Sequence, residues 1–271
     1  MATILVTGGL GFIGSHTTVA LQQAGHEVII IDNLSNASIE VKDRIAKITG
    51  KAPIFEQIDL REKDKVQDFF LRYPNIDGVI HFAASKAVGE SVEKPLLYYE
   101  NNIASLIYLL QELQKRKNTA FIFSSSCTVY GQADKLPVTE DAPFKQAECP
   151  YGNTKQINEE IIRDTCAIAK SIKAISLRYF NPIGAHQSAL IGELPNGVPQ
   201  NLIPYITQTA IGLRESLSVY GDDYPTPDGT CIRDYIHVVD LAEAHLAALE
   251  YILQGKIQDN YEVFNVGTGK G

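Results

Sequence analysis

Short apolar runs recur along the chain as far as Phe180, and each of them predicts a buried strand. Most of the runs are continuously apolar and do not alternate with polar residues, as is typical of strands that are covered on both faces of a sheet. The predicted strands are TILVT (3–7), EVIIID (27–32), PIFEQID (53–59), GVIHFA (78–83), AFIFSSS (120–126) and AISLRYF (174–180).

Segments with helical periodicity separate these runs. The predicted helices cover residues 12–24, 62–72, 95–116 and 151–170. A repeated alternation of strand and helix implies parallel strands joined by right-handed crossovers. The sequence therefore predicts an α/β fold of the Rossmann type, with a doubly wound parallel sheet.

The pattern changes after Phe180. Residues 181–204 are rich in glycine, proline and asparagine and have no sustained period, and such long irregular stretches are usually functional. We expect a smaller C-terminal unit to lie over the carboxyl edge of the sheet, where ligands bind. Two further strands, 217–221 and 262–267, are predicted to return to the main sheet. We therefore predict two interleaved units, 1–181 and 182–271.

Composition limits the possible partners. The net charge of −8 and the pI near 5.3 argue against a nucleic-acid partner, which needs a basic surface. The four cysteines show no metal-ligand spacing and are typical of a reducing compartment. No apolar run reaches the ~20 residues of a membrane span, and no signal-peptide pattern opens the sequence. We expect a cytoplasmic protein with no metal and no membrane partner.

A glycine-rich loop, TGGLGFIG (7–14), follows the first strand and opens the first helix. Its Gly9-x-Gly11-x-x-Gly14 spacing permits a tight turn and a close approach of backbone amides to a pyrophosphate. Asp32 ends the next strand, where a carboxylate accepts from a ribose 2′-hydroxyl and repels a 2′-phosphate. The sequence therefore predicts NAD rather than NADP, against the alternative of a structural turn. Asp59 is expected either to contact the adenine or to cap the next helix.

Tyr151 and Lys155 are four residues apart on the helix that is predicted to begin near Pro150. At ~100° per residue they share one edge with Ile162 and Cys166, and a second apolar line runs beside them. That second line consists of Ile157, Ile161 and Ile168. The opposite side is expected to hold Gln156, Glu159, Glu160, Arg163, Asp164 and Lys170.

A buried lysine beside a tyrosine suggests acid–base chemistry. A free tyrosine has a pKa of roughly 10, and lowering it toward 7 takes roughly 4 kcal/mol of selective phenolate stabilisation. An adjacent ammonium, a helix N-terminus and a nicotinamide cation are the expected sources. Ser124, Ser125 and Ser126 end the fifth strand, where they either hydrogen-bond a substrate hydroxyl or satisfy the loop.

Several motifs resemble one known family. TGGLGFIG, SSSCTVYG, YGNTK and RYFNPIGAH resemble the extended short-chain dehydrogenase/reductases. FAASKAVGESVEKP, NLIPYI and DGTCIRDYIHVVDLAEAH are similar to the members that epimerise UDP-sugars at carbon 4. The resemblance spans essentially the whole chain. It implies that bound NAD oxidises carbon 4, that the 4-keto sugar turns over and that UDP-glucose and UDP-galactose interconvert.

The resemblance also implies site residues. Catalysis is assigned to Ser126, Tyr151 as the base and Lys155 as its electrostatic partner. Cofactor binding is assigned to Gly8, Gly11, Phe12, Ile13, Gly14, Asp32, Asn33, Leu34, Ser35, Asn36, Asp59, Leu60, Phe82, Ala83, Ala84, Ser85, Lys86, Asn101, Tyr151, Lys155 and Phe180. Substrate binding is assigned to Lys86, Ser126, Tyr151, Tyr179, Asn181, Asn201 and Arg233.

Other functions remain open at this point. A sugar-nucleotide dehydratase needs carboxylates near Thr128, where Ser126, Cys127 and Val129 stand instead. A dehydrogenase that releases its reduced cofactor, another UDP-sugar-modifying member of the family, and a non-catalytic NAD-binding or scaffold domain are the further alternatives. The sequence does not distinguish acceptance of UDP-N-acetylhexosamines.

The resemblance carries two more expectations. Related chains continue beyond NVGTGKG (265–271), so the substrate domain is expected to be partial. NAD binding would then survive, while affinity for the UDP-sugar and turnover suffer. The helices 95–116 and 151–170 carry more apolar surface than one sheet face covers, which predicts an isologous homodimer.

Overall fold

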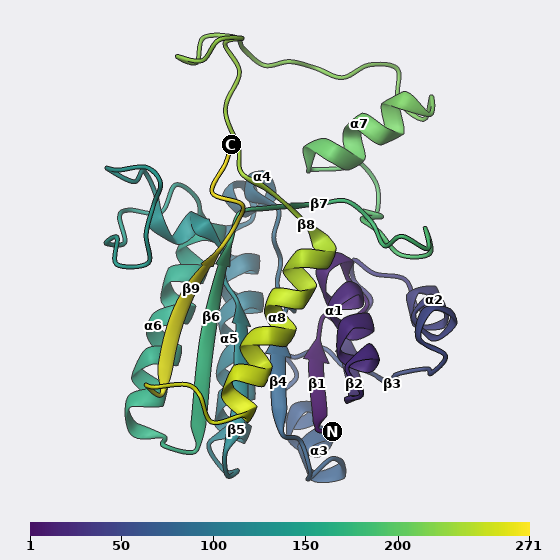
Figure 1. Cartoon of the computed structure of the whole chain (residues 1–271), viewed down its shortest axis with the longest axis vertical. Helices are drawn as coiled ribbons and strands as arrows, with labels where there is room; N and C mark the ends of the chain where they lie inside the picture. Colours follow the sequence, from purple (N-terminus) through teal and green to yellow (C-terminus); the bar gives the residue numbers. More distant parts are fainter.

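The computed structural model describes all 271 residues and is organised around one parallel sheet (Figure 1). Its seven strands follow the order β3-β2-β1-β4-β5-β6-β9, and every neighbouring pair is parallel. They are β1 (Thr3–Thr7), β2 (Glu27–Asp32), β3 (Ile54–Gln57), β4 (Gly78–His81), β5 (Thr119–Ser124), β6 (Ile172–Tyr179) and β9 (Tyr261–Val266). The predicted doubly wound sheet is confirmed, and the six strands predicted up to Phe180 differ from the observed strands only at their ends.

Helices cover both faces of the sheet (Figure 1). One face is covered by α1 (Phe12–Gln23), α2 (Glu40–Thr49) and α8 (Val238–Leu253). The other face is covered by α3 (Lys63–Arg72), α5 (Pro95–Leu113) and α6 (Pro150–Ile168). In β1, Leu5 packs in one core, and Ile4 and Val6 pack in the other. This two-sided burial explains why the strands are continuously apolar.

Several elements were not predicted. They are α2, α8, α4 (Val88–Glu93), the 3-10 turn η1 (Cys127–Tyr130), α7 (Leu202–Ala210), β7 (Asn181–Ile183) and β8 (Tyr235–His237). The predicted strand 262–267 is confirmed as β9, which joins the sheet beside β6. The predicted strand 217–221 is wrong. Tyr220 there is 99% exposed, and no strand lies alongside to accept its backbone bonds, so the apolar pattern alone does not form a ladder.

Residues 184–234 project from the carboxyl edge of the sheet, as Figure 1 shows for α7 and the long loop after it. Parallel pairing of β7 with β8 anchors the two ends of this excursion. After it, α8 packs against α1 and β9 pairs with β6, both on the main body. The domain boundary between 181 and 182 stays a prediction.

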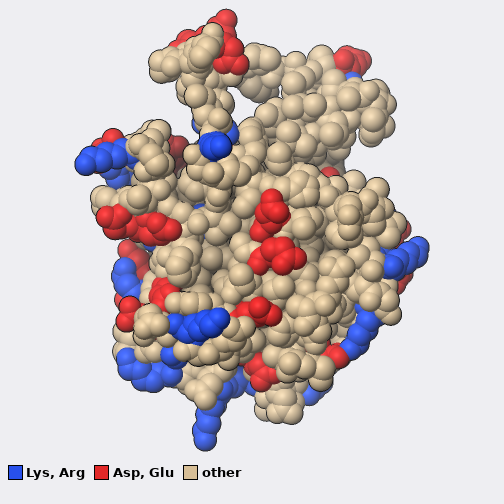
Figure 2. All heavy atoms as spheres, in the orientation of Figure 1, with Lys and Arg blue, Asp and Glu red and all other residues tan.

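The surface offers no large area of one charge on the face that Figure 2 shows, where acidic and basic side chains are interspersed. None of the helices combines the length and the hydrophobicity that crossing a membrane requires. In an open parallel sheet of this kind, ligands bind at the carboxyl edge of the strands, so the candidate site is expected there.

Candidate active site

The loop between β1 and α1 requires glycines because backbone passes very close to backbone. A Cβ on Gly14 would lie 2.3 Å from the carbonyl oxygen of Gly8, and one on Gly8 would lie 2.8 Å from the amide nitrogen of Ala83. Gly8 also has a φ of 67°, in the left-handed region. Gly11 is the N-cap of α1 and supplies no side-chain cap. The first amides of α1 are therefore available to an anionic group.

Replacing Gly14 with alanine is expected to destabilise the protein and abolish NAD binding, because the loop must open to admit the methyl group. The matched control is Gly89→Ala in α4, where a Cβ meets no atom within 4 Å. Calorimetric titration of NAD and a urea denaturation curve measure both effects. Unchanged affinity in Gly14→Ala would contradict the prediction.

Asp32 lies at the end of β2, beside this loop. Its carboxylate is buried and accepts hydrogen bonds from the amides of Leu10 at 3.2 Å and Leu34 at 2.9 Å. Burial raises the pKa of Asp32, and the two amide bonds oppose that shift. Leu10 belongs to the glycine loop, so the structure brings the loop and its expected acidic partner together.

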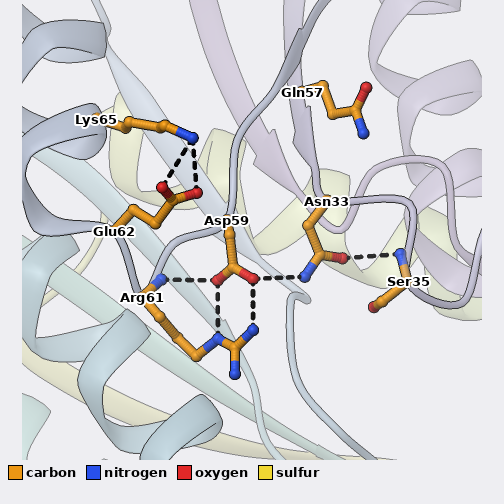
Figure 3. A pocket seen from close by; sticks show the side chains of 7 residues that line it. All are labelled: Asn33, Ser35, Gln57, Asp59, Arg61, Glu62 and Lys65. Atoms are coloured by element: carbon orange, nitrogen blue, oxygen red, sulfur yellow. Dashed lines mark hydrogen bonds and ion pairs between the residues drawn. The ribbon is translucent and has the colours of Figure 1, made fainter.

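A polar pocket of about 450 Å³ adjoins the end of β2 (Figure 3). Its lining residues are Asn33, Ser35, Gln57, Asp59, Arg61, Glu62 and Lys65. Asp59 caps no helix, since α3 begins after Glu62 without a side-chain cap. Instead it binds Arg61, with Nη2 2.7 Å from Oδ2 and Nε 3.0 Å from Oδ1. Hydrogen bonds from Arg61 are the main cause that lowers the pKa of Asp59 to about 2.

The sequence analysis did not single out Arg61, because it lies far from Asp32 along the chain. Arg61 comes from the loop after β3. Both oxygens of Asp59 bind the Arg61 guanidinium, and Asn33 Nδ2 donates to Oδ2 at 3.1 Å. The charge of Arg61 is thus balanced within the pocket (Figure 3).

Tyr151 and Lys155 both point inward from the first turns of α6. Pro150 occupies the first turn, and the Cys149 sulfur caps the helix by accepting from the Gly152 amide at 3.5 Å. Lys155 is 3% exposed, and its Nζ donates to the carbonyl oxygen of Ser124 at 2.7 Å. The same Nζ lies 5.8 Å from the centre of the Tyr151 ring. The predicted pair is thus buried on one edge of the helix.

Burial dominates the protonation of this pair. It raises the pKa of Tyr151, and a hydrogen bond with Ser126 opposes the shift. The expected lowering of the Tyr151 pKa is therefore absent in the protein alone, because burial outweighs the hydrogen bond with Ser126. Burial also lowers the pKa of Lys155 to about 8, against the opposing charge of Glu159.

The three serines after β5 differ in their contacts. Ser124 Oγ lies 2.8 Å from the hydroxyl of Tyr179. Ser125 Oγ donates to Glu159 Oε1 at 2.5 Å. Ser126 Oγ accepts from the Thr128 amide at 3.3 Å, and it is the serine whose side chain opposes the rise in the pKa of Tyr151. The structure therefore brings Ser126, Tyr151 and Lys155 together.

Two positions on α6 differ from the predicted faces. Glu159 was expected on the solvated side, but it is 3% exposed and pairs with Arg178 of β6. Ile168 was expected in the second apolar line, but it is 86% exposed. The helix packs against β6 and β9 at the edge of the sheet, so its buried face is turned toward Glu159 and its last turn extends beyond the core.

The predicted cofactor residues after β4 form one connected group. Asn101 Nδ2 donates to Ser85 Oγ at 3.1 Å, and the amide of Ser85 donates to Asn102 Oδ1 at 2.8 Å. The Phe82 ring lies 4.7 Å from the His245 ring. This loop faces the glycine loop, since the amide of Ala83 is close to Gly8.

The predicted substrate residues lie on or near the excursion that begins at β7. Asn181 Nδ2 donates to the Asp234 carbonyl at 2.9 Å. The preceding Phe180, a predicted cofactor residue, adjoins Gly267. Lys86 and Asn201 meet at Glu193, with donor distances of 3.0 and 2.5 Å to Oε1. Arg233 is exposed and binds only the Ile232 carbonyl. Glu193 was missed because nothing in its irregular segment signalled a role.

The pKa of Lys155, lowered to about 8, predicts opposite pH slopes for activity and stability. Activity should fall as the pH rises through 8, because the ammonium is lost. From about 8 to 10.5 the unfolded chain holds a proton that the folded chain has released, so stability should rise relative to Lys155→Met. Paired pH profiles of kcat and of unfolding free energy check this. Parallel slopes would contradict it.

Comparison with known proteins shows similarity over the whole chain. Residues 4–267 match the NAD dependent epimerase/dehydratase family. The chain is 50% identical over 269 residues to the UDP-glucose 4-epimerase of Erwinia amylovora, covering 99% of this chain and 79% of that protein. It is 51% identical over 268 residues to that of Bacillus subtilis, covering 99% and 78%. The crystal structure of UDP-glucose 4-epimerase from Bifidobacterium longum in complex with NAD⁺ and UDP has a TM-score of 0.94 at 47% identity, over 100% of this chain and 79% of that one.

Proposed function

Since this chain belongs to the NAD-dependent epimerase/dehydratase family, we propose that it interconverts UDP-glucose and UDP-galactose through a transient 4-keto sugar. It is an isomerase of the epimerase type, and its cofactor is NAD. The observation that carries the proposal is the buried group Ser126, Tyr151 and Lys155 on a chain about half identical to UDP-glucose 4-epimerases.

The residues present fit NAD. Any side chain at Gly8 or Gly14 would clash with neighbouring backbone, and the first amides of α1 have no side-chain cap, so these amides can face a pyrophosphate. Asp32 is held next to that loop by two amides and would accept from the adenine ribose. Asn33 and Asp59 would border the adenine from the neighbouring pocket (Figure 3). The remaining predicted cofactor contacts are proposed on the same basis.

NAD held by these residues would supply a hydride acceptor for carbon 4 of the sugar, from which the hydride could return to the other face. The chain supplies the proton chemistry. Tyr151 is proposed to take the proton of the 4-hydroxyl and to give it back, at its phenol oxygen. Lys155 supports the phenolate by its charge, and the Ser124 carbonyl holds its Nζ in place. Ser126 is proposed to hydrogen-bond the reacting oxygen.

The substrate is proposed to lie between this group and the excursion from β7. Arg233 has no carboxylate partner, and its planar guanidinium suits a diphosphate. Lys86 and Asn201 converge on Glu193 and are proposed to border the nucleotide. Asn181 and Tyr179 are proposed to lie beside the sugar.

The direct test is conversion of UDP-galactose to UDP-glucose by the purified chain carrying NAD. We expect conversion without net accumulation of NADH, because the hydride returns to the sugar. Stoichiometric release of NADH would indicate a dehydrogenase instead. Tight NAD binding with no turnover would indicate a cofactor-binding module.

We also propose a homodimer that pairs α5 and α6 with their copies. Support comes from exposed apolar side chains near the start of α5. Leu96 of α5 is 80% exposed, and Val92 and Val88 of the preceding α4 are 62% and 52% exposed. Leu96→Asp is expected to give a monomer, since an isologous interface meets the charge twice. Leu213→Asp, at a leucine of similar exposure beyond α7, is the control. Light scattering measures both, and a monomeric parent would refute the proposal.

We propose galactose metabolism in the cytoplasm as the setting. The UDP-glucose 4-epimerase relatives support the pathway. Four free cysteines, of which Cys231 is exposed, fit a reducing compartment.

A further inference from the structure

A buried ion pair lies directly behind the catalytic group. Arg178 of β6 and Glu159 of α6 are 5% and 3% exposed. Arg178 donates from Nη2 to Oε2 at 2.6 Å and from Nε to Oε1 at 3.0 Å. The guanidinium also lies 4.9 Å from the ring of Tyr130 and 4.8 Å from that of Phe144. A buried ion pair often adds no net stability compared with apolar residues of similar size. Its position behind the catalytic group therefore suggests a role in positioning that group.

Glu159 connects this pair to the serine loop. Its Oε1 accepts from Ser125 Oγ at 2.5 Å, the shortest of its contacts. Ser125 stands between Ser124, whose carbonyl binds Lys155 Nζ, and Ser126, which bonds Tyr151. A shift of Ser125 therefore moves both contacts of the catalytic pair.

Arg178 connects the pair to the segment that leads into α6. Its Nη1 donates to the hydroxyl of Tyr130 at 2.9 Å and to the carbonyl of Glu140 at 3.2 Å. Tyr130 ends η1, and Glu140 lies in the loop before Tyr151. The two charges thus hold together β6, α6 and both segments that flank the catalytic group.

Glu159 also acts on Lys155 through its charge. It follows Lys155 by one helical turn, a spacing at which opposite charges attract. The other titratable neighbours of Lys155 are Tyr151 on the same helix and His81 on β4. His81 is neutral, because burial and the charge of Lys155 lower its pKa to about 3. Glu159 is therefore the negative charge that opposes loss of the Lys155 proton.

We infer that Glu159 is a positioning residue: through Ser125 it fixes the serine loop against Tyr151 and Lys155, and through its charge it keeps Lys155 protonated. This inference rests on the proposed function for its kinetic consequences. It is separable from that function, because the proton affinity of Lys155 is measurable without turnover.

The first test removes the connection and leaves the ion pair intact. In Ser125→Ala, Glu159 keeps its bonds to Arg178, so the fold should persist. We expect kcat to fall about tenfold with KM nearly unchanged, since ground-state binding is not involved. Ser176→Ala is the matched control. Ser176 is equally buried and lies 2.9 Å from the hydroxyl of Tyr261, which donates to Glu159, but it does not contact the serine loop.

The second test removes the charge and keeps the shape. Glu159→Gln should move the alkaline limb of the kcat profile to lower pH by about one unit, since a favourable charge partner is lost. Titration of Lys155 Cε by NMR of lysine-labelled protein, assigned with Lys155→Met, should show the same direction. Ser176→Ala should leave both unchanged.

The outcomes distinguish the two proposals. If the parent protein does not convert UDP-galactose, the proposed function is refuted. If Glu159→Gln nevertheless lowers the pKa of Lys155, the role of Glu159 toward Lys155 is supported. Suppose instead that the parent protein is active. The inference alone is then overturned if Ser125→Ala has the same kcat as Ser176→Ala, or if Glu159→Gln leaves the titration of Lys155 unchanged.

Discussion

Tyr151→Phe is expected to lower kcat for UDP-galactose conversion by roughly 10²- to 10⁴-fold, the usual contribution of a general acid–base group. The variant loses the hydroxyl that faces Ser126 and keeps the ring. The ring lies 5.8 Å from Lys155 Nζ, so the lysine retains its packing. NAD affinity and the unfolding free energy should change little. Steady-state kinetics with an equilibrium NAD-binding measurement separate the two effects.

A second buried tyrosine provides the control. Tyr98 of α5 is fully buried, and its hydroxyl donates to Glu90 at 3.0 Å, outside the catalytic group. Tyr98→Phe should retain nearly full turnover, because Glu90 also binds Lys94. Equal turnover of the two variants would exclude Tyr151 as the proton carrier.

Arg178→Leu is expected to destabilise the protein by about 3–5 kcal/mol, because it leaves the charge of Glu159 buried without a counter-ion. Ser125 and Tyr261 would remain as its only hydrogen-bond donors. Urea denaturation of the parent and the variant measures this loss.

The double variant Arg178→Leu/Glu159→Leu tests the cause. Removing both charges should restore most of the lost stability, since a buried ion pair replaced by apolar residues is often close to neutral. It should not restore activity, because Ser125 then has no acceptor. A double variant as unstable as the sum of its single variants would place the loss in packing rather than in charge.

The strands of the sheet could be predicted because each one is marked by an apolar run within a short segment of the sequence. Apolar runs such as EVIIID occupy both faces, and the runs themselves mark β1 to β6. The glycines of the loop mark a close backbone approach, which at Gly8 and Gly14 leaves no room for a Cβ. The positions of Tyr151 and Lys155 after Pro150 place them on one helix edge. One clue was available and not used: Arg178 lies in an apolar run, where a charge requires a partner.

What only the tertiary structure decided is how residues distant along the chain meet. The helical periodicity places Glu159 on the polar side of its helix. Glu159 is buried because α6 packs against β6 and β9. Asn33 reaches Asp59 because β2 and β3 are neighbours in the sheet. Residues 217–221 have a strand-like pattern but meet no partner strand. Helical and strand periodicity record which face of an element is apolar, whereas ion pairs and ladders need a second element whose position is set by the order of the strands.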